Sequence, residues 1–172
     1  MFNFIKREGE NILRKDPAAK NLFEAIFCYP STKAILYYKL AHGLYKKEKF
    51  TIARIISQRA RKVTGIEIHP GAILGEDIFI DHGMGVVIGE TAEVGNNVLM
   101  YHGVTLGGTG LEKGVKRHPT VEDDVIIGSG AKILGPVVIG KGAKIGANAV
   151  VITDVPPYAT AVGIPARIII KP

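Results

Sequence analysis

The sequence has one cysteine and no tryptophan among its 172 residues, and aromatic residues make up only 7% of it. A lone cysteine, Cys28, excludes an internal disulfide framework and is typical of reducing compartments. We expect it to be a small buried helix residue rather than a nucleophile. No apolar run reaches the roughly 18 residues of a membrane span, and the first residues lack a signal-peptide pattern. The expected location is therefore cytoplasmic, without membrane contact.

The net charge of +6 conceals two different halves. Residues 1–64 hold 14 Lys and Arg against 5 Asp and Glu, a net +9, whereas residues 65–172 hold 8 against 11, a net −3. The basic residues near 54–62 fall on one face of a predicted helix. A basic helix with few aromatic residues is typical of a solvated surface or a subunit contact, so nucleic acid is not expected as a partner.

Residues 68–155 repeat with a period of six. Aliphatic side chains recur at this spacing in three runs, which are Ile68, Leu74, Ile80 and Val86, then Ile88, Val94, Met100 and Leu106, and then Val121, Ile127, Ile133, Ile139, Ile145 and Val151. A small or branched apolar residue usually follows four positions later, as at Ala72, Met84 and Val155. This period does not fit the spacings of an amphipathic helix. It predicts short strands stacked into a solenoid, with glycines at the corners.

The repeat is interrupted twice, and each interruption carries a histidine. The register slips by two residues between Val86 and Ile88, just after the segment DHGMG at 81–85. Some nine extra residues separate Leu106 from Val121. Solenoids accommodate insertions as surface loops, which often form the binding face. We therefore expect an extruded loop at about 107–120 and functional residues near both interruptions.

The first half has a helical pattern. Asp16-Pro17 and Pro30-Ser31 resemble helix starts, and two apolar stripes follow. The stripes contain Ile35, Leu36, Leu40 and Leu44, and then Ile52, Ile55, Ile56 and Val63. The last helix should end near Gly65. An uncapped solenoid end would expose its core and unpaired strand groups, so we expect these helices to cap it.

The residues at the two interruptions include side chains that can take up a proton or bind a carboxylate. His82 follows Asp81, and histidine can take up a proton near neutral pH, although the pair is also compatible with a simple polar corner. His118 could be a surface imidazole, but Arg117 beside it offers a planar fork that suits a carboxylate. The glycine-rich segment 107–110 either presents N–H groups to an oxyanion or only turns the chain. It is not a Walker loop, because no Gly-Lys-Ser/Thr follows.

Several segments together resemble serine O-acetyltransferase, a hexapeptide-repeat acyltransferase that opens cysteine biosynthesis. They are IEIHPGA at 66–72, DHGMGVVIGETA at 81–92, TLGGTG at 105–110, RHP at 117–119 and VGIPAR at 162–167. The match covers roughly residues 16–171. The resemblance implies a mainly β fold, with residues 1–64 as an α-helical region and residues 65–172 as a left-handed parallel β-helix. It also implies transfer of acetyl from acetyl-CoA to the hydroxyl of L-serine, giving O-acetyl-L-serine and CoA, with no metal.

The resemblance also assigns roles to residues. His82 matches the base that removes the serine proton, and His118 belongs to the same catalytic group. Glu67 stands where the best-known members have an aspartate that orients the base, in the manner of the aspartate of a catalytic triad. The groups expected to hold serine are Asp16, Asp81, Arg117 and His118.

CoA is strongly anionic, yet the β-helical half is net acidic, so local cations must attract it. Basic residues recur along the later coils at Lys132, Lys141, Lys144, Arg167 and Lys171. The resemblance places the pantetheine arm in a groove between neighbouring β-helices of a trimer. The expected CoA-binding residues are Gly107, Gly108, Ala131, Lys132, Lys144, Ala149 and Arg167. Ala143 is a weaker candidate if its side chain faces inward.

The expected assembly is a homotrimer, possibly a dimer of trimers, with L-cysteine as a feedback inhibitor in the serine site. In the family an extended C-terminal tail docks into O-acetylserine sulfhydrylase. This sequence stops at Lys171-Pro172, which argues against that complex.

The sequence also bears on three other functions. An O-acetyltransferase for another hydroxyl acceptor, such as homoserine or a sugar, stays open as an alternative. A γ-type carbonic anhydrase needs three histidine ligands with two of them five residues apart, a spacing that His69, His82, His102 and His118 lack. A non-catalytic scaffold would be expected to lose His82 or the glycine-rich loop, and both are present.

Overall fold

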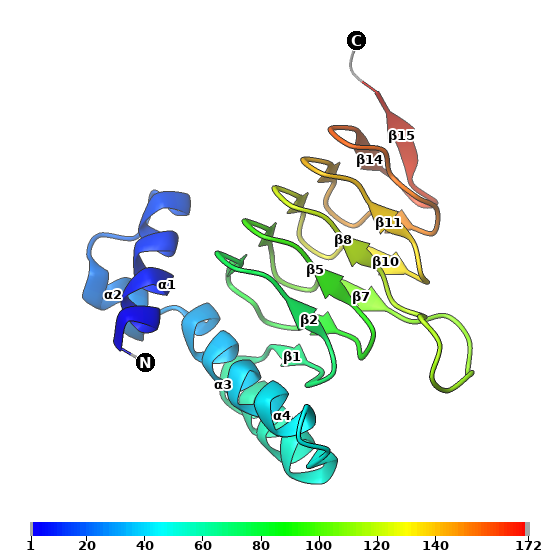
Figure 1. Ribbon diagram of the computed structural model, residues 1–172. Coiled ribbons are helices and arrows are strands. Elements are labelled where there is room, and N and C mark those ends of the chain that lie inside the picture. The colour runs from blue at the N-terminus through cyan, green and yellow to red at the C-terminus, as the bar shows by residue number, and fades with distance from the viewer. Residues whose placement is uncertain (1, 171–172) are drawn as a thin grey trace.

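The computed structural model describes residues 2–170 and consists of a helical part followed by a three-sided parallel β-helix (Figure 1). The helices are α1 (Phe2–Lys15), α2 (Leu22–Phe27), α3 (Pro30–Tyr45) and α4 (Phe50–Thr64). α3 and α4 pack closely against each other, and α1 and α2 form a second pair beside the β-helix. None of the helices in this range combines the length and apolarity needed to cross a bilayer.

The strands form three sheets, one for each side of the β-helix. Sheet A contains β1 (Glu67–Ile68), β4 (Val87–Ile88), β7 (Thr105–Gly107), β10 (Lys132–Leu134) and β13 (Val150–Val151). Sheet B contains β2 (Ile73–Leu74), β5 (Glu93–Val94), β8 (Thr120–Val121) and β11 (Val138–Ile139). Sheet C contains β3 (Phe79–Ile80), β6 (Leu99–Met100), β9 (Ile126–Ile127), β12 (Lys144–Ile145), β14 (Thr160–Val162) and β15 (Arg167–Ile169). All pairings are parallel except that of β14 with β15.

The strand register stacks the aliphatic positions of the repeat into one core. Ile68 pairs with Ile88 and Ile88 with Leu106, and the same column continues through later coils. These side chains are buried, as the period of six predicts. Leu74 is only partly buried, and Met84 departs furthest from the pattern, because the residue is 68% exposed. Two extra residues at the first register slip move Val86 into the inward position instead, and Val86 is fully buried.

The helices differ from the sequence prediction in two ways. α3 begins at Pro30 and α4 ends before Gly65 in a left-handed cap, both as predicted. Asp16-Pro17, however, follows the end of α1 instead of starting a helix. The predicted apolar stripe of α4 faces outward, with Ile55 63% exposed. The buried residues of α4 are the small ones, namely Ala53, Ser57, Ala60 and Thr64, because close packing of two helices needs small side chains.

The helices cap the open end of the β-helix through hydroxyl groups. Ser57 of α4 donates a hydrogen bond to the carbonyl of Ile68 in β1 (2.6 Å). Ser31 of α3 accepts one from the N–H of Ile80 in β3 (3.1 Å). β1 and β3 are the terminal strands of sheets A and C, so their outer backbone groups have no further strand to pair with. The two serines satisfy groups that burial would otherwise leave unpaired.

Tyr38 of α3 makes the corresponding contact to sheet B. Its hydroxyl donates to the carbonyl of Ala72 (2.7 Å) and accepts from the N–H of Leu74 (3.2 Å). Tyr38 is buried and belongs to the same core cluster as the β-helix. On each of its three sides, the first coil is therefore capped by a side chain from a helix. The division of the chain into residues 1–64 and 65–172 as separate domains stays a prediction.

Replacing Tyr38→Phe should lower the free energy of unfolding by about 1–3 kcal/mol, because it leaves a buried carbonyl and a partly buried N–H without their partner. Urea denaturation at a fixed protein concentration measures this loss. Tyr37→Phe is the matched control, since Tyr37 is less buried and its hydroxyl makes no hydrogen bond within residues 2–170. Equal stabilities for the two variants would contradict a capping role for the Tyr38 hydroxyl.

Candidate functional site

His82 lies at the corner between β3 and β4, where the register slips. Its φ is 57°, and Gly83 and Gly85 follow at 72° and 77°. Glycine adopts this left-handed backbone without a steric penalty, which allows the chain to widen the corner by two residues. The N–H of Gly85 donates to the carbonyl of Gly65 (2.9 Å), which fixes the corner against the end of α4. The His82 side chain is 71% exposed and is thus presented to the outside.

A hollow of about 300 Å³ contains three of the predicted residues: Asp16, Asp81 and His82. His82 Nε2 lies 3.7 Å from Asp81 Oδ2. Tyr29 and Cys28 also line the hollow. Cys28 is exposed at the C-terminal end of α2, so the expectation that it would be buried is wrong. The hollow combines a potential proton acceptor with two carboxylates, which suits a substrate that carries an ammonium group.

Tyr29 fixes one of these carboxylates. Its hydroxyl donates to Asp16 Oδ2 (2.5 Å), and the N–H of Ala18 donates to Asp16 Oδ1 (2.8 Å). These two bonds, with a smaller contribution from the nearby His82, hold the pKa of Asp16 below its usual range. The Tyr29 ring in turn packs against Phe79 of β3, with ring centroids 6.2 Å apart. Sequence reasoning missed Tyr29, because nothing in its local pattern separates it from a core aromatic residue.

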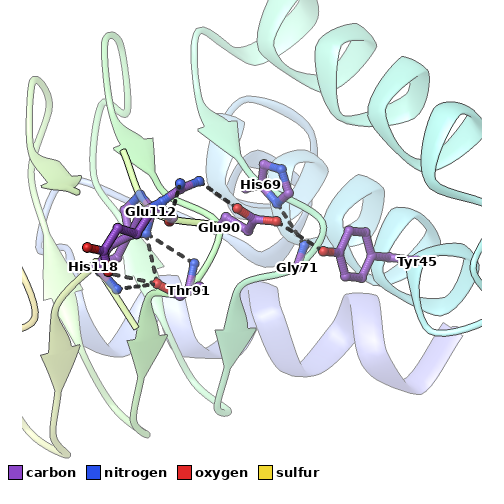
Figure 2. Close-up of polar contacts among 8 residues, drawn as sticks. Tyr45, His69, Gly71, Glu90, Thr91, Glu112 and His118 are labelled. Atoms are coloured by element: carbon purple, nitrogen blue, oxygen red, sulfur yellow. Dashed lines mark hydrogen bonds and ion pairs between the residues drawn. The ribbon is translucent and has the colours of Figure 1, made fainter. Parts of the chain in front are cut away.

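Arg117 and His118 form a second cluster with Glu90 and Thr91 (Figure 2). An Arg117 guanidinium nitrogen lies 2.6 Å from Glu90 Oε2. Glu90 Oε1 accepts a hydrogen bond from the Tyr45 hydroxyl of α3 (3.2 Å). Figure 2 shows this line of contacts running from the helix to the base of the loop. Glu90 therefore holds the arginine in place, although the sequence analysis gave it no role.

His118 is almost enclosed, with 8% of its surface exposed. A Cβ at Gly89 would come within 1.9 Å of the imidazole, and a Cβ at Gly108 would lie 3.1 Å from His118 Nε2. Glycine at position 89 is thus what makes room for the ring. Burial, together with the positive charge of Arg117, lowers the pKa of His118.

In one chain the two clusters lie at opposite ends of the strands of sheet A, and therefore at different corners of the β-helix. His82 precedes β4 and follows β3 of sheet C, whereas Glu90 and Thr91 follow β4 and precede β5 of sheet B. The fold therefore brings Asp16, Asp81 and His82 together, and separately brings Arg117 and His118 together, without joining the two groups.

Glu67 lies on the outer face of β1 and has partners other than His82. Its carboxylate accepts a hydrogen bond from Gln58 (3.2 Å) and lies 3.6 Å from Arg54 and 3.3 Å from Arg61. Among residues 2–170, no hydrogen bond or ion pair joins Glu67 to His82. Its role in orienting the base stays a prediction.

The candidate CoA residues occupy two faces of the β-helix. Lys132 lies in β10 of sheet A, where its ammonium donates to the carbonyl of Gly103. Lys144 and Arg167 are exposed on sheet C. Ala131 and Ala149 are fully buried in the single chain, as Ala143 is, so their contact with CoA stays a prediction. Lys171 lies outside the described residues.

The glycines of the loop base are close to the His118 cluster. Gly107 ends β7, and its carbonyl accepts from the N–H of Gly135 (3.0 Å). The N–H of Thr109 donates to the carbonyl of Arg117 (3.3 Å), which closes the base of the loop. Among residues 2–170, no three His, Cys, Asp or Glu side chains group as ligands for a metal ion.

Comparison with known proteins extends these observations. The family described as "Bacterial transferase hexapeptide (six repeats)" matches residues 118–153. The serine acetyltransferase of Bacillus subtilis strain 168 is 54% identical over 170 residues, which cover 99% of this chain and 78% of that protein. The serine acetyltransferase of Helicobacter pylori strain J99 is 57% identical over 162 residues, with 94% of both chains covered.

Solved structures of serine acetyltransferases also match, at lower identity. The serine acetyltransferase of Neisseria gonorrhoeae in complex with serine has a TM-score of 0.90 and 41% identity, covering 96% of this chain and 68% of that one. A serine acetyltransferase in complex with cysteine has a TM-score of 0.93 and 41% identity, covering 97% of this chain and 69% of that one. These matches confirm the predicted fold, a left-handed parallel β-helix preceded by helices. The chain therefore belongs to the serine acetyltransferase family.

Proposed function

We propose that this protein transfers the acetyl group of acetyl-CoA to the hydroxyl of L-serine, and that His82 is the general base. The observation that carries the proposal is the hollow in which His82 lies beside Asp16 and Asp81. Thiol release from acetyl-CoA, measured with serine, homoserine and simple sugars as acceptors, tests it. A preference for a sugar would contradict the assignment of the acceptor.

The chemistry follows from the residue types. His82 takes the proton from the serine hydroxyl as its oxygen attacks the thioester carbon, because the hydroxyl is a poor nucleophile at neutral pH. When the carbon–sulfur bond breaks, the same proton can pass from His82 to the departing CoA thiolate. Asp16 and Asp81 balance the serine ammonium, and Arg117 pairs with its carboxylate. A carboxylate-binding arginine favours an amino acid over a sugar.

We propose further that the complete site forms between two subunits of a homotrimer. This proposal is supported by the position of the two clusters, which lie at opposite ends of the strands of sheet A. In a cyclic assembly each subunit contact joins two different surfaces. The corner that carries the His82 cluster in one chain can therefore face the corner that carries the Arg117 cluster in the next chain. The same arrangement would face Lys132 on sheet A with the sheet C cations of a neighbour, forming a groove for CoA. A pairing of two trimers and a cytoplasmic location both stay predictions.

His82→Ala should lower kcat by about 10²–10⁴-fold, which is the usual contribution of a general base. Acetyl-CoA binding, measured by calorimetry, should persist because the CoA candidates lie elsewhere. His102→Ala is the control, since the His102 ring lies 5.8 Å from that of His82 but does not line the hollow. A nearly unchanged kcat for His82→Ala would remove the assignment of the base.

Arg117→Ala should weaken the binding of serine and of the inhibitor L-cysteine together, by about 1.5–3 kcal/mol for one lost charge-assisted contact. The serine KM and the cysteine inhibition constant measure this. Lys116→Ala is the matched control, because this neighbouring cation pairs with Glu93 at the surface (2.7 Å). If only one of the two ligands is weakened, serine and cysteine do not share the Arg117 contact.

Mixing two impaired variants, assayed at serine concentrations well below KM, tests the shared site. Trimers co-expressed from equal amounts of His82→Ala and Arg117→Ala chains should recover about a quarter of the wild-type sites, because a site with both native residues needs one chain of each kind in the right order. Turnover per active site, with each variant alone as the control, measures the recovery. Mixed trimers no more active than the separate variants would place both groups in one chain.

A further inference from the structure

Thr91 surrounds one nitrogen of His118 with hydrogen-bond donors. The Thr91 backbone N–H points at His118 Nδ1 (3.2 Å), and the Thr91 hydroxyl oxygen lies 2.9 Å from the same nitrogen. A backbone N–H can only donate, so Nδ1 must offer a lone pair to it. This contact alone disfavours a proton on Nδ1.

The Thr91 hydroxyl has no freedom to act as the acceptor. Its oxygen already accepts hydrogen bonds from the backbone N–H of Arg117 (3.0 Å) and of His118 (3.2 Å). These two bonds occupy both lone pairs, which leaves the hydroxyl hydrogen to be donated to Nδ1. Figure 2 shows these contacts converging on Thr91. The neutral ring must therefore carry its single proton on Nε2.

We infer that Thr91 is a positioning residue, which locks His118 as a neutral imidazole with its proton on Nε2, so that His118 serves the reaction only as a hydrogen-bond donor. Nε2 has no hydrogen-bond partner within residues 2–170, and it keeps some contact with solvent. It is thus free to donate to an oxygen of the substrate. Building on the proposed function, we assign that oxygen to the serine carboxylate, which Arg117 also contacts.

The same geometry excludes His118 as a general base. A base needs a free lone pair, but Nδ1 is engaged by Thr91 and Nε2 carries the proton. The surroundings of the ring also favour its neutral form. Burial, Arg117 and Lys116 lower the pKa of His118, and only Glu90 raises it. The other imidazole in this region, His69, is held neutral too, since burial lowers its pKa to about 4.

Nitrogen NMR of the wild-type protein tests the lock without reference to activity. Protein carrying ¹⁵N-histidine should show His118 as the neutral Nε2–H tautomer, with nitrogen shifts that stay constant between about pH 6 and pH 8, where an ordinary histidine titrates. His118→Gln identifies the signals. An Nδ1–H tautomer, or titration of His118 in this range, would overturn the inference even if serine proves to be the acceptor.

Variants at position 91 separate the hydroxyl from the backbone. Thr91→Val keeps the shape but removes the hydroxyl and its three hydrogen bonds. The Nδ1–H tautomer of His118 should become more populated, and the serine KM should rise about tenfold, as expected when the hydrogen bond from Nε2 to serine is lost. Thr91→Ser keeps the hydroxyl and should retain the wild-type shifts and KM. If Thr91→Val leaves both unchanged, the hydroxyl does not hold the ring. A shift change without a KM change would retain the lock but refute the assigned contact with serine.

Discussion

The open edge of the first coil is the constraint on which the rest of the structure depends. A parallel β-helix has unpaired strand groups at its end, and burying them without partners is costly. Ser57, Tyr38 and Ser31 supply one hydroxyl to each of the three sides. Because these residues come from α3 and α4, moving the helices elsewhere would leave the strand groups of the first coil without partners. Their position is therefore fixed by hydrogen bonds between side-chain hydroxyls and the strand backbone as well as by apolar contact.

This cap also determines the first half of the site. Ser31 contacts β3, and α3 begins one residue earlier at Pro30. The preceding residue, Tyr29, is thereby held beside Phe79, where its hydroxyl reaches Asp16. A carboxylate distant in sequence thus comes to the hollow of His82. Ser31 closes the solenoid and Tyr29 shapes the hollow of His82, so both contacts come from the same short segment.

The sequence predicts the solenoid well, because the fold is itself a repetition and the period of six reflects it directly. It predicts Met84 wrongly, since a two-residue slip reassigns the inward position to Val86. It also misjudges α4, where small residues face inward for close packing and Ile55 faces outward. Hydrophobicity alone does not distinguish these cases.

The site was predictable only in part, and for a similar reason. Residue types and resemblance identified His82, Asp81 and Arg117, but the hydrogen bonds of Thr91 to His118 join positions 27 residues apart. They exist only because the extruded loop folds back onto the corner after β4. No local pattern at Thr91 signals a distant partner. The same holds for Gly89, whose missing side chain matters only once the imidazole lies over it.

The roles proposed for the two histidines illustrate how burial assigns opposite tasks to one residue type. A general base must gain and lose a proton in every turnover, which requires access to water and to the substrate. His82 has that access, with 71% of its side chain exposed at a widened corner. A fixed donor must keep its proton through the reaction, which favours an enclosed ring with one nitrogen already engaged. His118, 8% exposed and held by Thr91, meets that requirement. The difference arises from the backbone, since an insertion in the coil exposes one ring and a glycine beneath the other allows it to be enclosed.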